Sequence, residues 1–146
     1  LLPSLPIASA QTFLLADRRG HAALVECCAQ GLALRRASPE HPCLWSVNAF
    51  HLPETLGLQD IPEDDWAAGR RWSTLQKVLS QRGADLTLRE AQNLLAGRYG
   101  FLCQYDRSRD QDTVWSVVCD LGQGALYRAI GNPARSPFQL DRRFSF

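Results

Sequence analysis

The order of the predicted elements constrains the fold of this sequence most, because strands come first, helices follow and strands return. Two apolar stretches, residues 12–17 and 21–26, flank a turn rich in Asp, Arg and Gly, and a turn at residues 29–31 leads into a strand at 32–35. A further short strand is predicted at residues 44–48. The nearly continuous apolar character of these strands predicts a sheet that is covered on both faces.

Two helices are predicted in the middle of the chain from their start signals and their apolar spacing. The first begins at a capping box formed by Asp60 and Glu63 and ends at Gly83. The second begins at a capping box formed by Thr87 and Glu90. The apolar positions that recur at helical spacing are Ala68, Trp72, Leu75 and Leu79 in the first helix, and Leu88, Ala91 and Leu95 in the second.

After a polar loop at residues 106–112, the chain returns to strands. Residues 113–121 and 125–130 form a predicted hairpin around a Gly-Gln-Gly turn, and a final strand is predicted at residues 140–146. Runs of strands that are separated from a run of helices are typical of an α+β domain. The length of 146 residues suits a single domain that spans residues 1–146.

Charge and cysteine usage narrow the classes of protein to which the chain can belong. Sixteen basic and fifteen acidic residues are interspersed and give a net charge of +1, which provides no basic surface for nucleic acid. No apolar run approaches the roughly 20 residues needed to span a membrane. An odd count of five cysteines does not suit a secreted disulfide framework, so we expect reduced thiols and a cytoplasmic protein.

A zinc site is a further hypothesis, because several Cys and His residues lie in one stretch of the sequence. No CxxC or HxxxH spacing occurs among them, and adjacent cysteines on a strand point to opposite faces. We therefore expect structural roles for these residues and neither a metal nor a cofactor, and we expect Cys103 and Cys119 to be core thiols. The cluster in question consists of Cys27, Cys28, His41, Cys43 and His51.

Several short segments occur in an order that resembles the later part of a known group of amide hydrolases. These segments are residues 13–20 (FLLADRRG), 24–26 (LVE), 47–50 (VNAF), 68–75 (AGRRWSTL), 116–120 (SVVCD) and 126–133 (LYRAIGNP). Together they resemble the N-terminal-nucleophile hydrolase superfamily, in particular choloylglycine hydrolase and acyl-CoA:6-aminopenicillanic acid acyltransferase. The Gly131-Asn132-Pro133 end of the last segment is the most specific of these matches.

The resemblance implies a fold and an activity. The implied fold is part of a four-layer αββα sandwich, and the implied activity is hydrolysis or acyl transfer at a linear amide C–N bond of a small molecule. In this superfamily an N-terminal Cys attacks the amide carbonyl, and its own α-amine accepts the proton. Residue 1 is Leu, so we expect the nucleophilic Cys on an N-terminal segment or chain outside this sequence and expect the isolated chain to be inactive.

The resemblance also implies two catalytic residues. Asn48 matches the position whose side-chain amide donates to the oxyanion, although Val47 and Ala49 depart from the usual Thr and His. Arg71 matches a helix Arg that organises the surroundings of the nucleophile, and helical spacing places it beside Leu75 and the apolar stripe. The alternatives are that Asn48 caps a turn and that Arg71 forms a structural ion pair.

Substrate-binding residues and partners complete these expectations. Trp45 and Phe50 are candidates for lining an acyl site, and their alternative is a place in the core. Half of a layered sandwich would expose apolar sheet surface, so we expect a homo-oligomer. The alternative function is that of a non-catalytic fragment or divergent relative that keeps the fold and acts only in binding or assembly.

Overall fold

The computed structural model describes residues 7, 9–59, 66–103, 105–106, 108 and 110–144. The chain divides into two compact units, Leu1–Ala68 (unit 1) and Gly69–Phe146 (unit 2). The described residues form antiparallel sheets and helices, which confirms the predicted α+β class.

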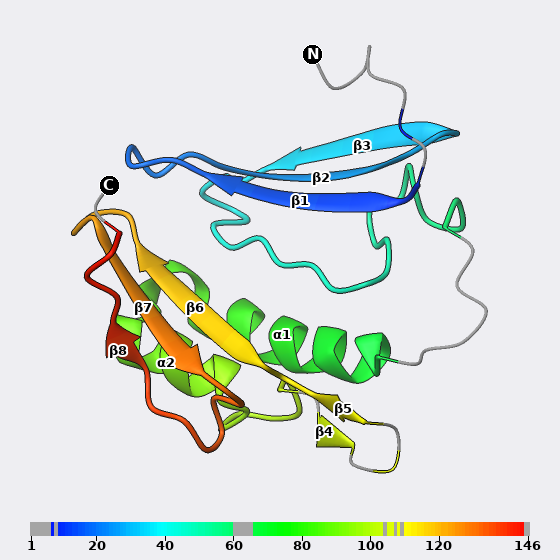
Figure 1. Ribbon diagram of the computed structural model, residues 1–146. Coiled ribbons are helices and arrows are strands. Elements are labelled where there is room, and N and C mark those ends of the chain that lie inside the picture. Colours follow the sequence, from blue (N-terminus) through cyan, green and yellow to red (C-terminus); the bar gives the residue numbers. More distant parts are fainter. Residues whose placement is uncertain are drawn as a thin grey trace. The chain divides into compact units, whose positions relative to one another are not determined.

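Unit 1 is built on a three-stranded antiparallel sheet. Its strands β1 (Gln11–Ala16), β2 (Ala22–Cys28) and β3 (Gly31–Arg36) lie in the order β1-β2-β3 and confirm the predicted meander (Figure 1). The Asp17 carboxylate closes the first turn by accepting hydrogen bonds from the backbone N–H groups of Arg19 and His21 at 2.8 and 3.0 Å. Short polar side chains that bond to the backbone nearby favour turns of this kind.

Burial in this sheet differs between its centre and its edges. The five residues Leu24–Cys28 of the central strand β2 are all buried, as expected for a strand covered on both faces. The edge strand β1 instead exposes Phe13, Leu14 and Leu15 by 39%, 51% and 52%. The prediction that both faces are covered is therefore correct for β2 and wrong for β1, because side chains on an edge strand have side chains of a neighbouring strand on one flank alone.

The segment 37–59 crosses one face of this sheet without forming a strand (Figure 1). The strand predicted at residues 44–48 is therefore wrong: residues 42–47 are irregular, and a bend follows at residues 48–49. Leu52 from this segment packs with Leu24 and Ala33 in the core of the unit, with Leu44 beside them. The apolar residues that suggested a strand serve here to attach an irregular segment to the sheet.

The first helix of unit 2, α1 (Ala68–Arg82), begins later than predicted. The proposed capping box of Asp60 and Glu63 lies outside the described residues. Ala67 has a positive φ of 50°, which is incompatible with an α-helix running through it. The predicted end is confirmed, because Gly83 has a φ of 55° and opens the short 3-10 helix η2 (Gly83–Asp85).

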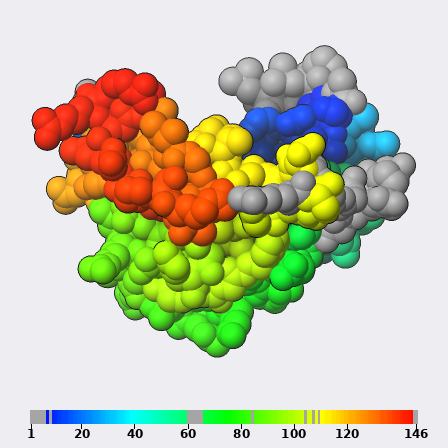
Figure 2. Space-filling model, turned by 60° about the horizontal axis from the view of Figure 1, so that its bottom comes forward, coloured from blue at the N-terminus to red at the C-terminus, as the bar shows by residue number. Residues whose placement is uncertain are grey.

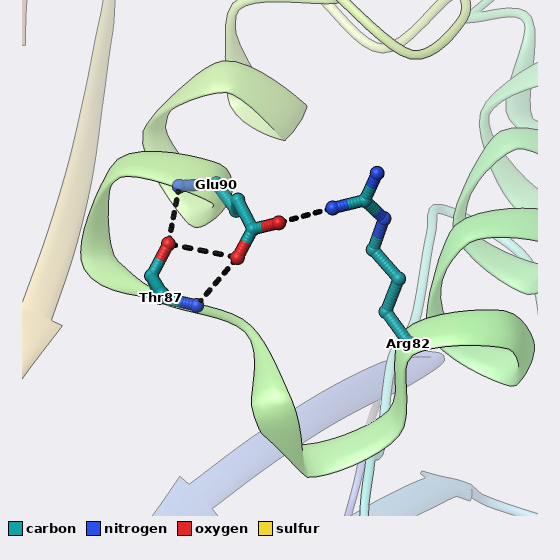
Figure 3. A network of polar contacts seen from close by, with 3 residues as sticks. All are labelled: Arg82, Thr87 and Glu90. Carbon is teal, nitrogen blue, oxygen red and sulfur yellow. Dashed lines mark hydrogen bonds and ion pairs between the residues drawn. The ribbon is translucent and has the colours of Figure 1, made fainter.

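The second helix, α2 (Leu88–Leu95), confirms its predicted capping box. The Thr87 hydroxyl accepts a hydrogen bond from the Glu90 N–H at 3.3 Å, and the Glu90 carboxylate accepts one from the Thr87 N–H at 2.9 Å (Figure 3). Arg82 adds an ion pair to the same carboxylate. The apolar face is centred on Leu94, which is 6% exposed, whereas the predicted stripe of Leu88, Ala91 and Leu95 is half-buried.

The larger sheet of unit 2 consists of β6 (Trp115–Asp120), β7 (Ala125–Ile130) and β8 (Gln139–Leu140) in the order β6-β7-β8. Helix α2 packs against β6. Figure 2 shows that the segment after β7, in orange and red, lies beside the green helical part of the same unit. The predicted hairpin is confirmed. The predicted last strand is too long, because Asp141 accepts hydrogen bonds from Arg143 and the chain turns there.

The predicted polar loop contains a short ladder between β4 (Tyr105–Asp106) and β5 (Gln111–Asp112). This ladder connects to the Gly131-Asn132-Pro133 segment, because the Asn132 side-chain amide donates a hydrogen bond to the Asp112 carboxylate. Asn132 is 3% exposed, and its side-chain oxygen accepts from the Ala134 N–H at 2.9 Å. The hydrogen bond that Asn132 donates to the Asp112 carboxylate is the largest cause that lowers the pKa of Asp112, and the hydrogen bond from Arg135 lowers it further. The segment that marked the resemblance most strongly is thus a buried structural turn.

Candidate active site

Asn48 lies in an irregular loop whose backbone is held by one side chain, that of Gln59. The Gln59 amide nitrogen donates to the Asn48 carbonyl oxygen at 3.2 Å, and the Gln59 amide oxygen accepts from the Phe50 N–H at 2.8 Å. One carboxamide therefore fixes the chain on both sides of Ala49. Asn48 itself is exposed, which suits a residue that meets a ligand.

The next residues of the loop are anchored to the sheet by Glu26. This residue lies in β2 and is 0% exposed. Its carboxylate accepts hydrogen bonds from the His51 N–H at 2.8 Å, the Leu52 N–H at 2.9 Å and the Thr55 hydroxyl at 2.6 Å. A buried charge is tolerated when hydrogen bonds satisfy it in this way. The carboxylate replaces the backbone partners that residues 51 and 52 would have had in a strand.

Other side chains around the loop are buried or half-buried. Phe50 is 5% exposed and Trp45 is half-buried. Both belong to the segment 37–59 of unit 1 that also carries Asn48. Burial lowers the pKa of His51, and the neighbouring Glu26 carboxylate acts in the opposite direction.

Arg71 lies in the second turn of α1, in the other unit from Asn48. It is half-buried and Arg70 is exposed, as the helical spacing predicts. Arg70 stacks on the ring of Phe101 at 4.2 Å. Gly100 also lies close to α1, because a Cβ at its position would be 2.8 Å from the Thr74 hydroxyl oxygen. The segment after α2 therefore packs on α1, and these contacts hold the helix that carries Arg71.

The five cysteines are free thiols. Burial raises the pKa of Cys27, with the adjacent Cys28 adding to the effect, and burial also raises the pKa of Cys43. Such thiols are poor nucleophiles, because the thiolate is the reactive form. Cys103 is half-buried and Cys119 is exposed on β6, so the prediction of a core thiol is wrong for Cys119. Within the described ranges, no group of three or more His, Cys, Asp or Glu residues could hold a metal ion.

A cavity of about 290 Å³ lies in unit 2, and the four residues predicted as site residues are not among those that line it. Arg128 and Arg143 line it, and both form ion pairs with Asp141, at 3.2 and 2.6 Å. The hydrogen bond from Arg143 is the largest cause that lowers the pKa of Asp141 to about 2. Because the two cations already share this carboxylate, we do not assign the substrate site to this cavity.

The chain matches a known protein family over most of its length. The motif order and the α+β fold are those expected for the N-terminal-nucleophile hydrolase superfamily. A family model described as acyl-coenzyme A:6-aminopenicillanic acid acyl-transferase matches residues 1–135, and this family lies within that superfamily. The chain therefore belongs to the acyl-coenzyme A:6-aminopenicillanic acid acyltransferase family, and its kind of function is acyl transfer or hydrolysis.

No curated protein and no solved structure matches the chain. None of the helices in the described part of the chain has the length and apolar character needed to cross a membrane.

Glu26 and Gln59 organise the Asn48 loop, and neither is predicted as a site residue from the sequence. A signal for Glu26 is present, because it is the one charged residue in the otherwise apolar stretch Ala22–Cys28. A charge at the centre of a buried strand requires a partner. Gln59 carries no comparable signal, because an amide in a polar loop is common and its two bonds depend on the path of the chain.

Proposed function

We propose that this chain supplies part of the active site of an amide C–N hydrolase or acyltransferase, with Asn48 as an oxyanion donor. The nucleophilic Cys comes from a segment outside this sequence. The observation that carries the proposal is the held loop around Asn48, in which Gln59 and Glu26 fix residues 48, 50, 51 and 52. A fixed donor is what oxyanion stabilisation requires, since it costs no reorganisation during the reaction.

The chemistry of such a site follows from the charges that develop during attack. The Cys sulfur bonds to the amide carbon, and its proton passes to the α-amine of the same residue. The carbonyl oxygen then carries a negative charge, to which the Asn48 side-chain amide donates. Collapse expels the amine, which takes the proton, and leaves a thioester that water or a second amine cleaves. Arg71 is assigned to organising the surroundings of the Cys, and Trp45 and Phe50 to the acyl-binding wall.

The positions of Cys27, Cys28 and Cys43 in unit 1 support a nucleophile outside this sequence. Cys27 and Cys28 are buried in the central strand of unit 1, where a substrate carbonyl has no access. Burial raises the pKa of Cys43. Burial thus opposes the thiolate form of Cys27 and Cys43 by raising their pKa, whereas an N-terminal Cys carries its own base.

Kinetics of the complete enzyme test this proposal, with an acyl anilide whose released amine is measured. Asn48→Ala is expected to lower kcat by about 100- to 1,000-fold, with little change in KM, as the loss of one oxyanion donor does elsewhere. Gln30→Ala is the matched control, because it removes an exposed amide from another turn of unit 1. A kcat for Asn48→Ala within threefold of the control would refute the assignment.

A second candidate, a binding or assembly module, is favoured by exposed apolar residues in each unit. In unit 1 the exposed residues are Phe13, Leu14 and Leu15. In unit 2, Trp115 is 59% exposed and Ile130 is 78% exposed, and these two residues are paired across the β6-β7 ladder. Surfaces of this kind mark interaction sites. Under this reading, the chain binds a partner or a second copy and the complete protein has no amidase activity.

A further inference from the structure

We propose that Gln59 is a positioning residue for Asn48, and that Glu26 fixes the other side of the same loop. This inference rests on the proposed role of Asn48 as an oxyanion donor. It assigns the geometry of the site to two residues that would not themselves touch the substrate.

The Gln59 carboxamide acts on the loop as a neighbouring strand would. A residue of a parallel strand donates its N–H to one carbonyl and accepts from the N–H two residues further on. Gln59 makes the same pair of bonds, to the Asn48 carbonyl at 3.2 Å and from the Phe50 N–H at 2.8 Å. The loop thus gains the hydrogen bonds of a strand at the residue that carries the functional amide, while Asn48 stays exposed.

Glu26 attaches the loop that carries Asn48 to the sheet of unit 1. It is fully buried in β2, between β1 and β3, and its carboxylate holds residues 51, 52 and 55. Leu52 also packs against Leu24 and Ala33 of the sheet. The loop is therefore fixed to the sheet directly after Phe50, and Gln59 fixes it from Asn48 to Phe50. A donor placed about 1 Å away from its productive position can lose about 100-fold in rate.

A positioning residue differs from a residue that only stabilises the fold, because its effect on kcat depends on the Asn48 amide. A residue that only stabilises the fold changes the amount of folded enzyme whatever residue occupies position 48. A residue that acts through Asn48 has no effect on kcat once the Asn48 amide is removed. The two substitutions are then strongly non-additive, as expected for groups that act as one unit.

The test is a double-mutant cycle in the complete enzyme with Asn48→Ala and Gln59→Met, which keeps the side-chain length but removes both hydrogen bonds. Gln59→Met is expected to lower kcat by about 10- to 100-fold, to leave KM within twofold and to have no further effect in the Asn48→Ala background. Gln30→Met is the matched control and should keep the activity of the unchanged enzyme.

Hydrogen exchange and kinetics together distinguish failure of the positioning role of Gln59 from failure of the proposed function of Asn48. Faster exchange at the Phe50 amide in folded Gln59→Met, measured with a thermal unfolding curve, would support the predicted contact. An unchanged Phe50 amide, an unchanged kcat or additive effects of the two substitutions would overturn the positioning role. If Asn48→Ala alone leaves kcat unchanged, the proposed function itself fails.

Discussion

The buried carboxylate of Glu26 leads to the sharpest stability prediction. Glu26→Ala removes the acceptor of three hydrogen bonds, from two backbone N–H groups and one hydroxyl. An unsatisfied buried polar group costs about 1–3 kcal/mol. The two backbone N–H groups lose their acceptor, whereas the Thr55 hydroxyl can still donate to the Leu52 carbonyl at 3.2 Å. Water that enters the vacated space recovers part of the cost, so we expect a loss of about 2–5 kcal/mol in the free energy of unfolding.

The conservative substitution Glu26→Gln has a smaller and calculable effect. One carboxylate oxygen accepts from Leu52 and Thr55, and the other accepts from His51 alone. A Gln side chain can keep the first pair of bonds with its oxygen, but its NH₂ group then faces the His51 N–H. One buried N–H is left without an acceptor, which corresponds to a loss of about 1–3 kcal/mol.

Urea unfolding followed by circular dichroism and tryptophan fluorescence measures these losses. Glu54→Ala is the control, because Glu54 is an exposed acidic residue of the same segment and its removal should change the free energy by no more than about 0.5 kcal/mol. The expected order of stability is Glu54→Ala, then Glu26→Gln, then Glu26→Ala. A stability of Glu26→Ala that equals that of the control would refute the anchoring role.

Three other predictions concern the rest of the chain. Thr87→Ala should cost about 1 kcal/mol in urea unfolding through loss of the α2 cap, and Thr87→Ser should restore it; equal midpoints for the two would contradict the cap. The pKa of Asp141 falls from 3.8 to about 2 in the folded state, so its contribution to stability is complete above pH 3.8 and is lost as the pH falls toward 2. Asp141→Asn should flatten the decrease in unfolding free energy between these pH values, and an unchanged slope would refute the pairing with Arg143. The exposed Phe13, Leu14 and Leu15 predict self-association in sedimentation velocity, whereas a monomer at all concentrations would contradict it.

Local signals in the sequence were sufficient for much of the fold. The hairpin at Asp17–Gly20 and the α2 cap at Thr87 were predicted because their turn and capping bonds are made between residues close in sequence. The end of α1 at Gly83 followed from the same kind of local rule. These elements depend on backbone chemistry within a few residues, which a single sequence contains.

The errors arise where distant residues determine the local structure. The segment 44–48 has the composition of a strand, yet its last residue, Asn48, bonds to Gln59. The loop that follows it bonds to Glu26, which lies 25 residues before His51 in the sequence. The family motif proposes Asn48 as a site residue, whereas the contacts that hold its loop span up to 29 residues and leave no local motif. The start of α1 was misplaced because Ala67 adopts a left-handed conformation that its side chain does not indicate.

Mapping the acyl-enzyme identifies the residue that serves as the nucleophile. The complete enzyme would be mixed with an acyl anilide, quenched in acid and digested, and the acylated peptide would be identified by mass spectrometry. We predict a thioester on an N-terminal Cys outside these 146 residues. Acylation of Cys27, Cys28, Cys43, Cys103 or Cys119 as the kinetically competent intermediate would contradict the claim.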